Sequence, residues 1–265
     1  MSQVQDIEQW VQFSSENTKA KMRLICFHHM GGSAQFFRSW STQLPDNVQL
    51  CLVQLPGRWD RIHEEPFTDM KSLIVKLQKT FEGILSLPFA VLGYSFGARV
   101  AFEFVRSLRR CKSPMPFAFF ALAARASLSA RRKAQLIHRP SDEQLLKILS
   151  EDFGALPEVV LQNEEMLKVI LKPLRADWQI LESYRYKAEA PFDFPIVALG
   201  GAEDRSVDLG GLKDWRQHTT GEFSFEMFKG AHFFAEESQA EVLKCICQFM
   251  NRYTGDGEDK AAKAI

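Results

Sequence analysis

The chain has 265 residues, and 46% of them are hydrophobic, which suffices for one large α/β domain or one domain with an insertion. The 33 basic and 33 acidic residues cancel, so the net charge of zero argues against nucleic acid or a strongly anionic surface as the partner. The five cysteines lack zinc-ligand spacing, and the polar N-terminus lacks the apolar segment of a signal peptide. We therefore expect reduced thiols and a cytoplasmic protein without membrane insertion.

Strand and helix patterns alternate through the first half of the chain. Apolar runs bounded by glycine and proline predict strands, and apolar residues at helical spacing predict the segments between them. Such alternation is typical of a mostly parallel sheet with helices on both faces. After a polar lead-in with a short helix around Ile7, Val11 and Phe13, strands are expected over 22–27, 48–55, 89–92 and 117–123, and helices over 35–44, 68–87 and 98–105.

The alternation stops after Ala126, and helical patterns follow one another up to Lys187. Ser141 to Gln144 fits a capping box that begins a helix over 145–153, which Gly154 ends. Prolines at 157 and 173 divide the remainder into two further helices, over 157–171 and 174–186. We expect this stretch to be an inserted helical lid, and an enlarged ordinary crossover is the alternative.

The strand and helix alternation then resumes and completes the core. Further strands are expected over 194–199 and 223–228, and further helices over 209–218 and 238–253. We therefore predict a core over 1–126 and 188–253, a lid over 127–187 and a disordered tail over 254–265.

The pentapeptide from Gly93 to Gly97 fits the G-x-S-x-G pattern with Ser95 at its centre. It lies between a predicted buried strand and a predicted helix, which is the context of a nucleophile elbow. The sharp turn strains the backbone at the serine and leaves no room for bulk two residues before and after it. We predict that Ser95 is a nucleophile, and a structural turn serine is the alternative.

A serine nucleophile needs a base and an acid. In proteins with a nucleophile elbow these two residues come later in the chain, on loops that follow later strands. His232 comes directly after the last predicted strand, whereas His218 ends a helix and is assigned a structural role. Asp204 follows the strand before that one, with Asp208 as its competitor. Imidazole can accept and return a proton near neutral pH, and the carboxylate would orient it.

Two backbone N–H groups are expected to hold the oxyanion. One belongs to Phe96, directly after the nucleophile, and the other to the glycine loop from His28 to Gly32, where we choose Met30. His29 is read chiefly as a hydrogen-bonded loop histidine.

These residues together resemble the type II thioesterases, the editing hydrolases of nonribosomal peptide and polyketide synthases. The chain is also similar to the medium-chain thioesterase of animal fatty acid synthase. The resemblance implies an α/β-hydrolase fold and the same roles for Ser95, Asp204, His232, Met30 and Phe96. It is carried by residues 24–34, 54–58, 93–97, 174–177, 200–204 and 230–234, with Arg61, Glu64 and Pro66.

The chain also departs from the family pattern near the nucleophile. His28 stands where proline is usual, Met30 where the residue is often small, and Tyr94 and Phe96 where histidine and methionine are usual. Ala231 replaces a glycine. None of these changes removes a group that the chemistry needs.

The resemblance implies hydrolysis of acyl thioesters on the phosphopantetheine arm of a carrier protein. We expect a monomer that needs no cofactor, metal or nucleic acid. The basic residues from Arg131 to Lys133 are a candidate contact for an acidic carrier protein, but a solvated basic surface is the preferred interpretation. A carboxylesterase or lipase acting on oxygen esters is the alternative enzyme, and an inactive binding module is the third hypothesis. The expected substrate contacts are His29, Gly31, Tyr94 and Phe233.

Overall fold

The computed structural model describes residues 3–13, 19–126, 141–153 and 162–253. Within these residues one seven-stranded sheet has the order β1-β3-β2-β4-β5-β6-β7. Every neighbouring pair is parallel except β1 with β3, so the predicted mostly parallel sheet is confirmed. The strands are β1 (Val11–Phe13), β2 (Met22–Phe27), β3 (Val48–Val53), β4 (Phe89–Tyr94), β5 (Ala118–Leu122), β6 (Ile196–Gly201) and β7 (Phe223–Phe228).

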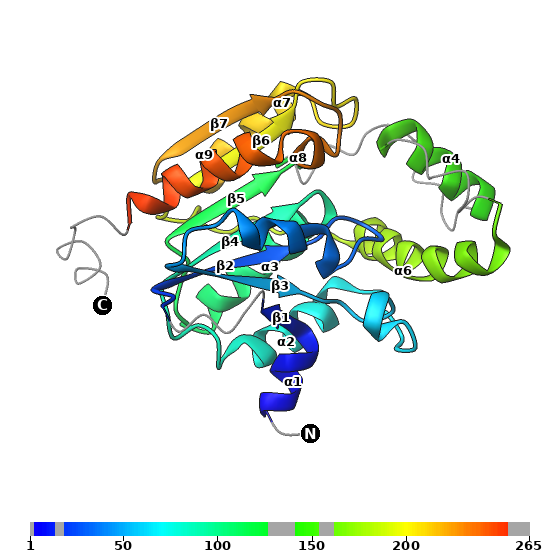
Figure 1. Ribbon diagram of the computed structural model, residues 1–265, viewed down its shortest axis with the longest axis horizontal. Helices are drawn as coiled ribbons and strands as arrows, with labels where there is room; N and C mark the ends of the chain where they lie inside the picture. The colour runs from blue at the N-terminus through cyan, green and yellow to red at the C-terminus, as the bar shows by residue number, and fades with distance from the viewer. Residues whose placement is uncertain (1–2, 14–18, 127–140, 154–161, 254–265) are drawn as a thin grey trace.

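Helices cover both faces of this sheet (Figure 1). Alternate residues of β2 show the division: Ile25 and Phe27 pack with α2 and α3, whereas Leu24 and Cys26 pack with η1 and α9. Both faces of the central strands are therefore buried, which explains their continuous apolar runs. The helices are α1 (Gln3–Trp10), η1 (Ala34–Thr42), η2 (Trp59–Arg61), α2 (Met70–Phe81), α3 (Phe96–Arg110), α4 (Asp142–Phe153), α6 (Glu164–Ser183), α7 (Leu209–Lys213), η3 (Asp214–His218), α8 (Phe234–Glu237) and α9 (Gln239–Asn251).

The N-terminal lead-in differs from the prediction. Its helix ends at Trp10, and Val11 to Phe13 form a strand instead of continuing it. Val11 pairs with Val53, so these three residues complete the backbone hydrogen bonds of β3 at the edge of the sheet.

The described part of the segment predicted as a lid consists mainly of α4 and α6, which lie together beyond one end of the sheet (Figure 1). The predicted capping box is confirmed: Gln144 N–H donates to Ser141 Oγ at 3.2 Å, and Ser141 N–H donates to Gln144 Oε1 at 2.9 Å. The predicted break at Pro173 is wrong, because α6 runs through it. Proline removes one main-chain hydrogen bond, but Leu171 and Leu174 on either side are buried, and this packing keeps the helix continuous.

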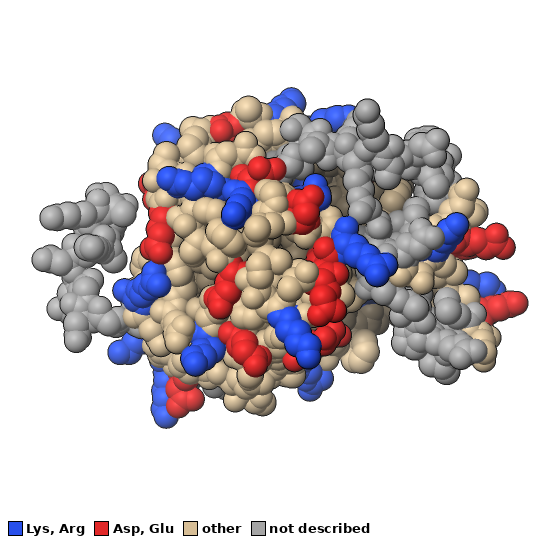
Figure 2. Space-filling view, turned by 90° about the horizontal axis from the view of Figure 1, so that it is seen from above, with Lys and Arg blue, Asp and Glu red and all other residues tan. Residues whose placement is uncertain are grey.

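Some predictions fall on residues that the structure does not describe. They include the basic residues from Arg131 to Lys133, the helix start at Pro157 and the predicted tail over 254–265. In the described ranges, no helix combines the length and apolar character needed to cross a bilayer. Basic and acidic side chains are interspersed on the face shown in Figure 2, as the balanced composition leads one to expect.

Candidate active site

The turn after β4 holds Ser95 in a strained conformation. Its φ of 54° and ψ of −113° lie in a region that residues with a side chain rarely adopt. The two glycines permit this turn, since a Cβ on Gly93 would lie 2.2 Å from Ala98 Cα and one on Gly97 2.2 Å from the Phe27 carbonyl oxygen. Helix α3 begins at the next residue, Phe96, so its first N–H groups lie beside the serine.

Three residues from separate loops meet at this turn. Ser95 follows β4, Asp204 follows β6 and His232 follows β7, and the carboxyl ends of these parallel strands share one edge of the sheet. His232 Nε2 lies 2.9 Å from Ser95 Oγ, and its Nδ1 lies 2.8 Å from Asp204 Oδ2. A hydroxyl, an imidazole and a carboxylate thus form one continuous hydrogen-bonded line.

The Asp204 carboxylate is buried but well provided with donors. Its Oδ1 accepts from Ser206 N–H and Ser206 Oγ, both at 2.7 Å, and from Val207 N–H at 3.1 Å. Burial raises the pKa of Asp204, but the hydrogen bonds from His232 and Ser206 outweigh it and leave the pKa below its ordinary value. Asp204 is therefore held as a carboxylate beside the imidazole.

The competitor Asp208 has a structural position instead. Its Oδ1 accepts from Gly211 N–H at 2.7 Å, which caps α7, and its Oδ2 pairs with Arg125.

A buried ion pair joins α6 to the segment after β3, and its carboxylate also binds the glycine loop. Asp177 on α6 and Arg58 after β3 are 1% and 4% exposed and make two hydrogen bonds, of 2.8 and 3.0 Å. Asp177 Oδ2 also accepts the N–H of Gly31 at 2.8 Å. The next residue towards the N-terminus is Met30, and neither its N–H nor that of Phe96 has an acceptor among the described residues.

Comparison with known proteins agrees with this geometry. The model of the thioesterase domain family matches residues 22–250 of the chain. The chain belongs to the thioesterase domain family.

Relatives of this thioesterase work in natural-product pathways. It is 36% identical over 248 residues to the gramicidin S biosynthesis protein GrsT of Aneurinibacillus migulanus, covering 94% of this chain and 96% of the relative. The type II thioesterase BorB from the borrelidin biosynthetic cluster has a TM-score of 0.79 at 30% identity, covering 90% of this chain and 96% of BorB. ClbQ from the colibactin NRPS/PKS pathway has a TM-score of 0.81 at 26% identity, covering 88% and 98%. The architecture is therefore the α/β-hydrolase fold.

The four residues predicted to contact substrate differ in their exposure to solvent. The rings of His29 and Phe233 are partly exposed and pack edge to face, 4.9 Å between centroids, and Gly31 is also partly exposed. Tyr94 is fully buried, and its hydroxyl donates to the His232 carbonyl oxygen at 2.6 Å. This buried position favours a supporting role for Tyr94, which holds the main chain of His232, and its predicted contact with substrate stays a prediction.

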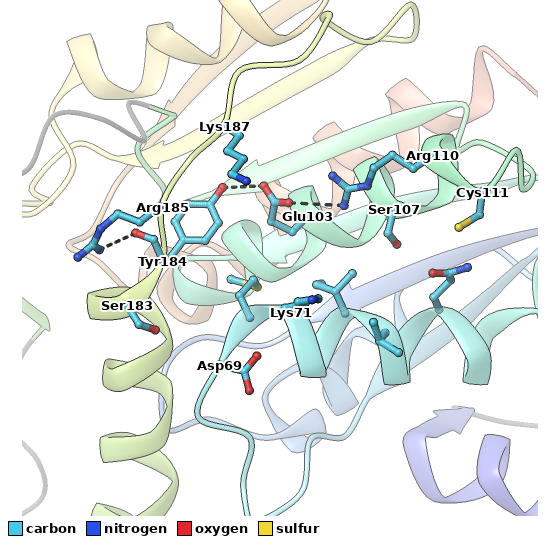
Figure 3. Close-up of a pocket in the computed structure, with 14 residues that line it drawn as sticks. Asp69, Lys71, Glu103, Ser107, Arg110, Cys111, Ser183, Tyr184, Arg185 and Lys187 are labelled. Atoms are coloured by element: carbon cyan, nitrogen blue, oxygen red, sulfur yellow. Dashed lines mark hydrogen bonds and ion pairs between the residues drawn. The ribbon is translucent and has the colours of Figure 1, made fainter.

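A cavity of about 550 Å³ lies away from these residues, between α2, α3 and the segment after α6 (Figure 3). Its wall includes the Tyr184 hydroxyl, which donates to Glu103 Oε1 at 2.6 Å. None of the predicted site residues lines this cavity. The Tyr184 to Glu103 contact does anchor the C-terminal end of α6 to α3.

Ser206 was not predicted from the sequence, although a hydroxyl two residues after a candidate acid was a usable signal. Its Oγ lies 2.9 Å from His232 Nδ1 and donates to Asp204 Oδ1, so it bridges the two groups. We expect Ser206→Ala to lower kcat/KM about fivefold, the effect of one hydrogen bond of about 1 kcal/mol, since two backbone donors to Asp204 remain. Steady-state kinetics would contradict this bridging role if kcat/KM were unchanged.

Acidification should destabilise the fold through His29. Burial lowers the pKa of His29 to about 4, whereas the unfolded chain titrates near its ordinary value of about 6.5. Between these values only the unfolded state binds the proton, so the free energy of unfolding falls as the pH falls from about 6.5 towards 4. Because the ring is partly exposed, we expect a loss of about 1 kcal/mol between pH 7 and 5. Urea unfolding of wild type and His29→Asn should give curves of different pH slope, and equal slopes would contradict the assignment.

Proposed function

We propose that this thioesterase hydrolyses acyl groups from the phosphopantetheine arm of carrier proteins, with Ser95 as nucleophile, His232 as base and Asp204 as acid. The observation that carries the proposal is the hydrogen-bonded line from Asp204 through His232 to Ser95. The names of the relatives support the substrate class, since GrsT is a biosynthesis protein of gramicidin S and BorB a type II thioesterase.

The reaction has two halves that use the same groups. His232 takes the proton of Ser95 Oγ as the oxygen attacks the thioester carbonyl, and the N–H groups of Met30 and Phe96 hold the oxyanion. As the C–S bond breaks, His232 returns the proton to the departing sulfur. His232 then deprotonates a water molecule that attacks the acyl-serine, and the proton passes back to Ser95 as the carboxylic acid leaves. Asp204 keeps the imidazole oriented and stabilises its cationic form.

In this proposal the segment 127–187, whose described part contains α4 and α6, forms the lid above the acyl group. The described residues supply part of it: Leu145 on α4 and Leu171 and Leu174 on α6 form an apolar cluster against which Met30 packs. A cavity of about 540 Å³ also borders the glycine loop and is lined by apolar residues of α6. In this proposal an acyl chain buries its apolar surface against these residues.

The rest of the proposal concerns partners and location. We infer a cytoplasmic monomer that needs neither nucleic acid nor a metal ion. The zero net charge and the interspersed charges in Figure 2 support the absence of a nucleic-acid partner.

Turnover of matched substrates tests the proposed substrate class. One acyl group would be presented as a thioester on a phosphopantetheinylated carrier protein, as a thioester of N-acetylcysteamine and as an ethyl ester. We expect kcat/KM to be highest for the carrier-bound thioester, because remote contacts to the carrier lower the barrier. For the ethyl ester we expect kcat/KM to be about tenfold or more lower than for the carrier-bound thioester. Equal or faster hydrolysis of the ethyl ester would favour a carboxylesterase, and no preference for the carrier would refute the proposed partner.

A further inference from the structure

Side-chain hydrogen bonds hold two consecutive peptide groups of the glycine loop. The carbonyl of His29 accepts from His28 Nδ1 at 2.8 Å and from Gly32 N–H at 3.1 Å. The carbonyl of Met30 accepts from His29 Nδ1 at 3.0 Å, and the N–H of the same peptide group donates to Asp177. The peptide planes on both sides of the Met30 Cα are therefore fixed.

The partner of His28 determines its tautomer. A carbonyl oxygen can only accept, so Nδ1 must carry the proton. The ring is 2% exposed, and burial together with the nearby Arg58 cation holds the pKa of His28 well below its ordinary value. Its Nε2 has no partner among the described residues, which suits a neutral ring because an unprotonated Nε2 leaves no N–H buried without an acceptor. His28 is thus a neutral donor directed at one backbone oxygen.

We propose that His28 is a positioning residue for the N–H of Met30, and this inference rests on the proposed function, which assigns that N–H to the oxyanion hole. The peptide group between His29 and Met30 is planar and trans, so its C=O and N–H point in opposite directions. A donor that holds the oxygen therefore sets the direction of the N–H. Such an oxyanion donor lowers the barrier because it is aimed before the charge develops.

Two substitutions separate positioning from simple packing. His28→Phe keeps a ring of similar size but loses the Nδ1 donor. His28→Asn loses the ring but places an amide N–H near the position of Nδ1. If His28 only filled space, the asparagine variant would be the more damaged of the two. If His28 positions the loop, the phenylalanine variant would be.

The experiment compares kcat, KM and inhibition by a trifluoromethyl ketone, whose adduct with the serine carries the oxyanion. For His28→Phe we expect kcat to fall about 10- to 100-fold, the inhibition constant to rise by a similar factor, and KM to stay within about twofold. His28→Asn should retain kcat within about threefold.

His218→Phe is the matched control. His218 is also buried, also has an unpartnered Nε2 among the described residues, and packs against Phe102 and Trp215. Its replacement should leave kcat unchanged.

A folded His28→Phe with wild-type kcat would overturn the inference, as would equal losses in both His28 variants or an unchanged inhibition constant. If His28→Phe does not fold, His28→Leu, which also lacks a donor, takes its place with the same expected results. Failure of the proposed function is a separate outcome: it would show as thioester hydrolysis that persists in Ser95→Ala, whatever the His28 variants do.

Discussion

Replacing Ser95 by alanine should lower kcat for acyl-thioester hydrolysis by about 10⁴-fold or more, because covalent catalysis then has no nucleophile. Alanine retains the Cβ, so the turn and its strain persist, and the melting temperature should stay close to that of wild type. Release of free thiol from an acylated carrier protein measures the reaction, and circular dichroism verifies the fold.

Ser39→Ala serves as the matched control for this substitution. Ser39 is an exposed residue of η1 whose hydroxyl donates to Gln239. Its loss should leave both kcat and stability unchanged. Hydrolysis by Ser95→Ala at the wild-type rate would refute the assignment of the nucleophile.

Replacing Asp177 by alanine should have the largest effect on stability. The substitution leaves the Arg58 guanidinium buried without its carboxylate, and breaking a buried ion pair in this way costs about 3–5 kcal/mol. It also leaves the Gly31 N–H without its acceptor, so kcat should fall in the protein that remains folded. Chemical denaturation measures the first effect and thioester turnover the second.

Two further variants serve as controls for Asp177→Ala. Glu222→Gln removes one partner of an exposed pair, with Arg252, and should cost less than about 1 kcal/mol. The double variant Arg58→Met with Asp177→Leu removes both buried charges and should recover most of the stability, but not the turnover, since Gly31 still lacks an acceptor. A loss of stability as small as that of Glu222→Gln would contradict the role of the buried pair.

The central part of the fold was predictable because its constraints are local. Strands β4 and β5 are buried on both faces, so nearly every residue is apolar and the runs stand out. The turn at Ser95 needs glycine on both sides for steric reasons, and both glycines lie within two residues of Ser95 in the sequence. Because parallel strands place their carboxyl ends together, the order of the later loops pointed to His232 and to the loop of Asp204, and the contacts of Asp208 with Gly211 and Arg125 separate it from Asp204.

The features that escaped prediction depend on partners distant in the chain. Strand β1 has only three residues and exists because β3 offers a free edge. The bond from Gly31 to Asp177 joins residues 146 positions apart, which no local pattern reports. The burial of Tyr94 could have been anticipated, since strand alternation puts it on the same face as Leu92, inside the core beneath α9.

The two parts of α6 on either side of Pro173 differ in the burial of their polar contacts, since Lys172 before the proline pairs with Glu65 at the surface. The part after Pro173 is tied to the body of the enzyme twice, by Asp177 to Arg58 and by Tyr184, directly after the helix, to Glu103. The part before it carries Met166 and Val169, which are 42% and 44% exposed, and the main chain there lacks one helical hydrogen bond. Because the contact of the second part with Arg58 is buried, a bend of α6 near residues 169–173 would move the first part and leave Asp177, and with it the Gly31 N–H, in place.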